Sequence, residues 1–105
     1  MYGSNDQVQI IAYGATNADL DLVSDSARKV ATAVINSKLN IHKNIESPSD
    51  EINECCNTLS AAIVSTSPEA TAESALWKAG MEMLKNLPDT TTDANWRVNI
   101  PTARF

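Results

Sequence analysis

Residues 19–39 read DLDLVSDSARKVATAVINSKL, with apolar side chains at the spacing of an amphipathic helix. The apolar stripe consists of Leu20, Val23, Ala27, Val30, Ala31, Val34 and Ile35. The opposite side, which we expect to face solvent, carries Asp25, Arg28, Lys29, Thr32 and Asn36. Asn17 or Asp19 can cap the first turn. The pattern predicts one long helix over 19–39 that buries Val30.

A short helix is expected before this segment. The hydroxyl of Ser4 can accept a hydrogen bond from the backbone N–H of Gln7, and the Gln7 side chain can reach back to Ser4, as in a capping box. Apolar residues then recur at helical spacing as far as Gly14, a common helix stop. These signals predict a helix over 4–13.

Two more helices are expected to start at Ser-Pro pairs, with the serine as N-cap and the proline at the first helical position. The pair at 47–48 starts a helix over 48–65, and the pair at 67–68 starts a helix over 68–86. The buried face of the first of these consists of Ile52, Cys55, Cys56, Leu59, Ala62 and Ile63. The stripe of the second consists of Ala72, Ala75, Leu76, Ala79, Met83 and Leu84. We expect Leu59 to lie in the core.

Together these patterns predict an all-α fold, with a small four-helix domain over 1–87 and an extended C-terminal arm over 88–105. The length of 105 residues accommodates one domain. Helical periodicity ends at Asp89, and from Trp96 onward large and polar side chains alternate, as in an extended segment. Pro101 excludes this segment from the middle of a sheet.

The charge of the chain argues against several classes of function. The net charge is −5, and the eight lysines and arginines are scattered, which argues against non-specific nucleic-acid binding. No apolar run approaches the roughly 20 residues of a membrane span. The first residues lack the basic start and apolar stretch of a signal peptide. We therefore expect a protein that folds in a cytoplasm and does not associate with a membrane.

No catalytic, cofactor or metal constellation is expected. Cys55 and Cys56 are adjacent, so they cannot join distant segments, and we expect two buried, reduced thiols that serve packing. His42 is the single histidine. A zinc site would need both thiolates beside it, but successive helix positions point about 100° apart. Gly3, Gly14 and Gly80 stand alone, so no glycine-rich phosphate loop is present.

The C-terminal segment is the candidate binding site. Its apolar side chains would leave costly area in water unless they pack on something. They can pack on the chain's own helices, on a sister subunit or on another protein, and the sequence leaves these alternatives open. Large aromatics and arginine dominate protein interfaces. We therefore assign partner binding to Trp96, Arg97, Ile100, Arg104 and Phe105.

The layout of the chain resembles the head–tail connector, or adaptor, proteins of tailed phages and archaeal tailed viruses. The likeness covers residues 2–87. Tyr2-Gly3-Ser4 precedes a short capped helix and a connector, and a long helix has the alanine-rich centre SARKVATAVIN at 26–36. A loop then leads to the proline-started helix SPSDEINE at 47–54, whose centre is again small and apolar at LSAAI, residues 59–63. Many members have a longer, more aromatic loop between the second and third helices, where this chain has a short one.

The resemblance implies a structural virion protein at the head–tail joint, folded in the host cytoplasm. Family members form a homo-oligomeric ring, commonly dodecameric, that docks under the portal protein and extends the DNA channel toward a downstream tail or stopper protein. DNA passes through such a channel without specific binding, and an extended terminal arm often grips the portal. No catalytic residues transfer, because the family has none. Residues 96–105 are the candidate arm here.

Two other classes of function stay open at this point. The first is a small cytoplasmic helical protein-interaction domain that binds one partner through its C-terminal segment. The second is a DNA-associated protein or an accessory subunit of an enzyme. Native mass in solution and behaviour with a portal protein separate the first from a ring subunit, and a salt-dependent DNA shift would identify the second.

Overall fold

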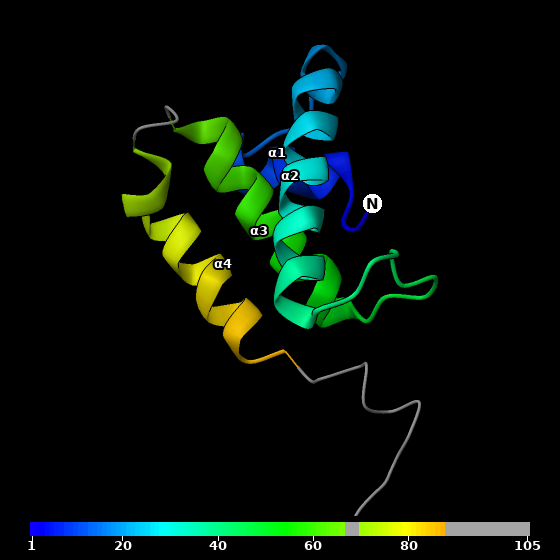
Figure 1. Ribbon diagram of the computed structural model, residues 1–105. Coiled ribbons are helices and arrows are strands. Elements are labelled where there is room, and N and C mark those ends of the chain that lie inside the picture. Colours follow the sequence, from blue (N-terminus) through cyan, green and yellow to red (C-terminus); the bar gives the residue numbers. More distant parts are fainter. Residues whose placement is uncertain (67–69, 88–105) are drawn as a thin grey trace, which may run out of the picture.

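The structure is a computed structural model that describes residues 1–66 and 70–87. Its elements are α1 (Asn5–Tyr13), η1 (Ala18–Leu20), α2 (Asp21–Leu39), α3 (Asp50–Ser65), η2 (Thr71–Glu73) and α4 (Ala75–Lys85), where η marks a 3₁₀ turn (Figure 1). The described residues contain no strand. The predicted all-α, four-helix fold is confirmed, and the predicted arm over 88–105 lies outside the described residues.

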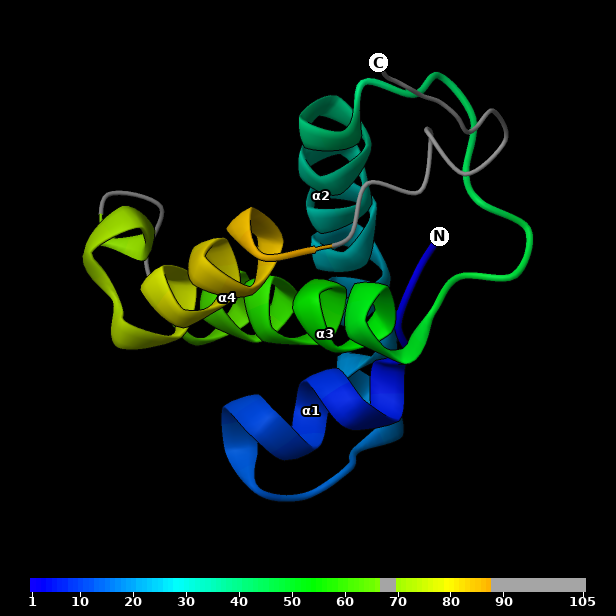
Figure 2. The same ribbon diagram turned by 90° about the horizontal axis from the view of Figure 1, so that it is seen from below.

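Helix α3 is the centre of the fold. It packs against α1, α2 and α4, and Figure 2 shows these three helices arranged around it. Every residue from Cys55 to Ala62 is buried, including polar ones, because neighbours cover the helix on several sides. The core cluster consists of Tyr2, Ala31, Ile35, Leu39, Ile52, Cys55, Cys56, Leu59 and Leu84. The prediction that Leu59 is buried is confirmed.

The first helix begins and ends where the sequence indicates. The Ser4 hydroxyl accepts from the backbone N–H of Gln7 at 3.2 Å, and Gly14 closes the helix with a left-handed backbone at φ 81°. The predicted hydrogen bond from Ser4 back to the Gln7 side chain is wrong. The backbone N–H of Ser4 donates instead to Oδ1 of Asn57 on α3, at 2.9 Å.

The predicted starts of the third and fourth helices are wrong. Helix α3 begins at Asp50, where the Ser49 hydroxyl rather than Ser47 accepts from the N–H of Ile52 at 3.3 Å. Helix α4 begins at Ala75, and its cap is Ser74, whose hydroxyl accepts from the N–H of Trp77 at 3.0 Å. In both cases a later serine with extended backbone supplies the same cap chemistry. Residues 67–69 lie outside the described residues.

The predicted apolar stripe of α2 is confirmed at Ala27, Ala31 and Ile35 but wrong at Val23 and Val30. Val23 and Val30 are 45% and 51% exposed, whereas the buried residues are Ser24, Ala27, Ala31, Thr32, Ile35 and Leu39. Thr32 and Ser24 are buried because they hydrogen-bond to the N-terminal segment and to α1, which hydropathy does not record. The buried face of α4 is likewise narrower than predicted: Gly80 and Leu84 are buried, and Ala75, Ala79 and Met83 are exposed.

The N-terminal segment is threaded between α2 and α3. The side chain of Tyr2 is buried at 1% exposure. Its hydroxyl donates to Oδ1 of Asn36 at 2.7 Å and accepts from the backbone N–H of Ile45 at 2.9 Å. Its backbone N–H donates to Oγ1 of Thr32 at 3.1 Å. Tyr2 therefore links α2 to the loop that leads into α3.

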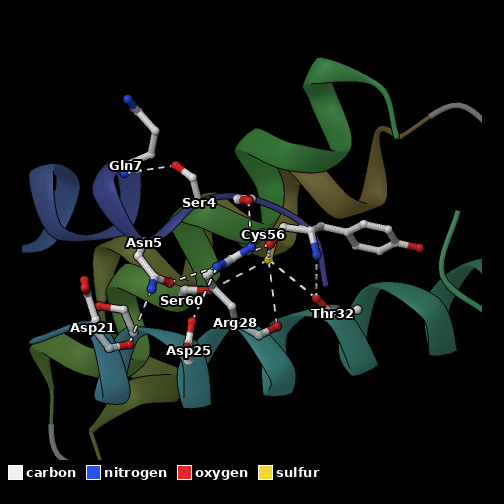
Figure 3. A network of polar contacts seen from close by, with 12 residues as sticks. Ser4, Asn5, Gln7, Asp21, Asp25, Arg28, Thr32, Cys56 and Ser60 are labelled. Atoms are coloured by element: carbon white, nitrogen blue, oxygen red, sulfur yellow. Dashed lines mark hydrogen bonds and ion pairs between the residues drawn. The ribbon is translucent and has the colours of Figure 1, made fainter. Parts of the chain in front are cut away.

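Arg28 of α2 holds the same segment by its guanidinium (Figure 3). Nε donates to the carbonyl of Tyr2 at 2.9 Å, and the two terminal nitrogens donate to the carbonyl of Gly3 and to Oδ1 of Asn5, each at 2.8 Å. From α3, Oδ1 of Asn53 accepts from the N–H of Gly3 at 2.9 Å. The expectation that Arg28 faces solvent is wrong, because its donors satisfy carbonyls that the fold removes from water.

The hydropathy pattern predicts that Val30 and Leu59 are both buried, but the structure buries only Leu59. Leu59→Asp should abolish the helical circular-dichroism signal, because an unpaired carboxylate in the core is costly. Val30→Asp should change the free energy of unfolding by less than about 0.5 kcal/mol, as exposed substitutions usually do. Loss of the fold in Val30→Asp would place that valine in the core after all.

Gly3 and Gly14 form a matched pair for testing the N-terminal segment. Both have positive φ, at 73° and 81°, but a Cβ on Gly3 would overlap the Asn57 side chain and one on Gly14 would meet nothing. Gly14→Ala should cost about 1–2 kcal/mol of backbone strain. Gly3→Ala should cost about 2–4 kcal/mol, because it also displaces the Asn57 hydrogen bond. Urea unfolding measures both, and equal losses would contradict the role given to Asn57.

Candidate interaction surfaces

The residues assigned to partner binding from the sequence all fall in one segment near the C-terminus. Trp96, Arg97, Ile100, Arg104 and Phe105 all lie within 88–105, outside the described residues. Their assignment stays a prediction. The surfaces that the structure does describe come from α2 and α4, and neither was identified from the sequence.

Cys55 and Cys56 are free thiols with no exposed area, as expected. Burial, with a smaller contribution from Cys56, raises the pKa of Cys55 to about 12. Burial also raises the pKa of Cys56, and hydrogen bonds from Thr32 and Ser60 oppose that rise. The Cys55 thiol donates to the carbonyl of Gly80 at 3.4 Å, and the Cys56 thiol donates to that of Tyr2 at 3.3 Å. The two thiols therefore join α3 to α4 and to the N-terminal segment.

His42 does not take part in a cluster of possible metal ligands. It is exposed in the loop between α2 and α3. Within 1–66 and 70–87, no group of three or more His, Cys, Asp or Glu side chains is placed to hold a metal ion. No helix in the same ranges is long and apolar enough to cross a membrane.

The first described surface is at the N-terminal end of α2, and we call it the α2 knob: Leu22 with Asp19, Asp21 and Asp25. Leu22 is 80% exposed, the highest value among the described large hydrophobic side chains. Asp19 and Asp21 are exposed as well. Asp21 accepts a hydrogen bond from Gln9 at 2.9 Å, and Asp25 lies 3.6 Å from Arg28. The knob thus combines one exposed apolar side chain with three carboxylates that are close to it in the sequence.

The second surface is a groove of about 640 Å³ beside α4, where its last turns approach the C-terminal end of α2. We call it the α4 groove. Its lining consists of Lys38, Ala72, Trp77, Lys78, Met81, Glu82, Leu84 and Lys85. Lys38 comes from α2 and the other lysines from α4. The single ion pair among the described residues joins Arg28 to Asp25, so none of these lysines lies within 4.0 Å of a described carboxylate.

We compared the chain with known protein families, curated proteins and solved structures. No family model, curated protein or solved structure matches the chain. The function proposed below follows from the fold, the α2 knob, the α4 groove and the layout of the sequence.

The buried thiols generate a prediction about reactivity and pH. At pH 8 only about 10⁻⁴ of a thiol with a pKa near 12 is ionised, so Cys55 should react with an alkylating reagent at least about 100-fold more slowly in native than in urea-unfolded protein. Mass spectrometry of labelled peptides measures this. Labelling of native Cys55 at the unfolded rate would contradict its burial.

The raised pKa of Cys55 also determines how the free energy of unfolding depends on pH. Between about pH 9 and pH 12 the unfolded chain releases the Cys55 proton and the folded chain retains it, so the free energy of unfolding should fall as pH rises through this window. The fall should be shallower in Cys55→Ala, which serves as the control for other groups that titrate there.

Proposed function

We propose that this chain is a structural subunit that assembles into a ring, as the head–tail adaptor of a tailed virus. The observation that carries the proposal is the apolar side of α2. Leu22, Val23 and Val30 are 45–80% exposed in the single chain. Covering such area against a sister subunit is favourable by about 25 cal/mol per Å², and a ring buries the same surface in every copy.

The order of the helices supports the assignment to the head–tail adaptors. A short capped helix, a long helix and a buried small-residue helix follow one another in the order that the adaptor family shares. In this reading the ring docks under the portal protein, and a tail or stopper protein binds below it. The net charge of −5 favours a channel wall from which DNA is repelled and along which it slides.

The segment 88–105 is assigned the role of the arm. Trp96 and Phe105 supply large apolar area, and Arg97 and Arg104 can pair with carboxylates on the portal or on a sister subunit. An extended chain can also add backbone hydrogen bonds to a neighbour, with Pro101 restricting these to one edge. In this proposal the protein acts by binding alone, without catalysis, cofactor or membrane.

A second candidate is a small helical interaction domain that binds one partner through the same segment. The observation that favours it is composition, because the segment contains one of the two tryptophans and the only phenylalanine of the chain. Such a domain would stay monomeric at all concentrations and would form a one-to-one complex. The two candidates therefore differ in stoichiometry.

The test uses the full chain and the portal protein encoded by the same genome. Sedimentation velocity should show a ring of many copies bound to the portal. A variant lacking residues 95–105 should retain its helical circular dichroism and its melting temperature, yet lose attachment to the portal, because the arm supplies that contact.

The test variant replaces Trp96 and Phe105 with Ala, and the matched control replaces Asn95 and Thr102 with Ala. The control should bind the portal normally and the test variant should not. A one-to-one complex of the intact chain would favour the second candidate. Unfolding of the truncated chain would show that the segment belongs to its own core.

A further inference from the structure

We infer that the α2 knob of one subunit inserts into the α4 groove of a second copy of this chain, and that this head-to-tail contact repeats around the assembly. The inference rests on the proposed function, because it names the surfaces by which the ring would form. It is carried by shape, by charge and by the position of the two surfaces on the molecule.

The knob has the properties of an interface anchor. Leu22 projects from the first turn of α2 with most of its area in water. Asp25 stands three residues further along the helix and therefore on the same side. Carboxylates around one exposed leucine keep the free subunit from associating at random, yet they complement a partner that offers cations.

The groove offers the matching features. Its apolar lining comes from Trp77, Met81 and Leu84, and methionine adapts its shape readily to an incoming side chain. Lys38, Lys78 and Lys85 line the same groove, with Glu82 as the one carboxylate. Three of the chain's eight lysines and arginines thus gather around one apolar hollow in a protein whose net charge is −5.

The two surfaces lie too far apart to meet within one chain. The knob is at the start of α2, whereas the groove includes Lys38, which is next to the last residue of that helix. Figure 1 shows the two ends of α2 far apart. A helix of 19 residues is about 28 Å long. A contact between two unlike surfaces of a subunit is heterologous, which produces a closed ring when the rotation between neighbours closes.

Charge favours a second copy over the chain's own C-terminal segment as the occupant. Residues 88–105 contain two aspartates and two arginines, so they offer no net charge to the lysines. The knob presents three carboxylates next to its leucine. The contact should therefore also weaken as salt is raised.

The experiment uses two full-length variants, Leu22→Lys for the knob and Met81→Glu for the groove. Both positions are exposed, so both variants should fold, which circular dichroism checks. Each variant should associate at least tenfold more weakly than the native chain, because each places a like charge in the contact. An equimolar mixture should form heterodimers, since the intact knob of Met81→Glu can enter the intact groove of Leu22→Lys. Ile10→Lys, at a 45% exposed position on α1 outside the knob and the groove, is the matched control and should associate normally.

Sedimentation equilibrium over a range of concentrations, alone and with the portal protein, gives the readout. Native-like association of Leu22→Lys and Met81→Glu would overturn the inference and leave the ring itself standing. Loss of association on deleting residues 88–105, with Leu22→Lys unaffected, would make that segment the occupant and also overturn it. A native chain that stays monomeric in both settings would overturn the proposed function and this contact together.

Discussion

The guanidinium of Arg28 is the interaction on which the rest of the structure depends. Its three donors hold the carbonyls of Tyr2 and Gly3 and the side chain of Asn5, between α2 and α3. These carbonyls belong to a segment without helix or sheet, so they need partners from elsewhere once the fold covers them. With Arg28 in place, Tyr2 can be buried and α1 can start at Asn5 against α3. Tyr2 of the N-terminal segment is therefore part of the core.

This constraint also sets the rotation of α2. Successive helical residues are about 100° apart, so Val30, two residues after Arg28, points to nearly the opposite side. Thr32, four residues after Arg28, points the same way as Arg28 and meets the backbone of Tyr2. Orienting α2 to bury Val30 would turn both polar contacts away from the segment. The polar contacts of Arg28 and Thr32 with the N-terminal segment determine the rotation of α2 more strongly than burial of the valines does. The apolar side of α2 therefore stays exposed.

The sequence predicts those parts of the fold that are encoded locally. Helix type and number, the bounds of α1 and the burial of Leu59 follow from periodicity and caps, which need only near neighbours. The predicted start of α3 is wrong because Ser47 and Ser49 both make good caps and only tertiary contacts choose between them. The phase of α2 depends on partners 26 to 30 residues away in the chain. A local signal for the knob did exist: Leu22 stands outside the apolar stripe, among aspartates.

In the proposed ring, the packing on α3 would determine the angle between neighbouring subunits. The knob is fixed to α2 and most of the groove to α4, and both helices are oriented by their contacts with α3. The approach of α4 is close, since a Cβ on Gly80 would lie 2.6 Å from Cδ2 of Leu59. A larger residue at 80 would tilt α4 and move the groove relative to the knob. Small residues buried in the centre of the subunit would thus control the curvature of the whole assembly, although none of them touches a neighbour.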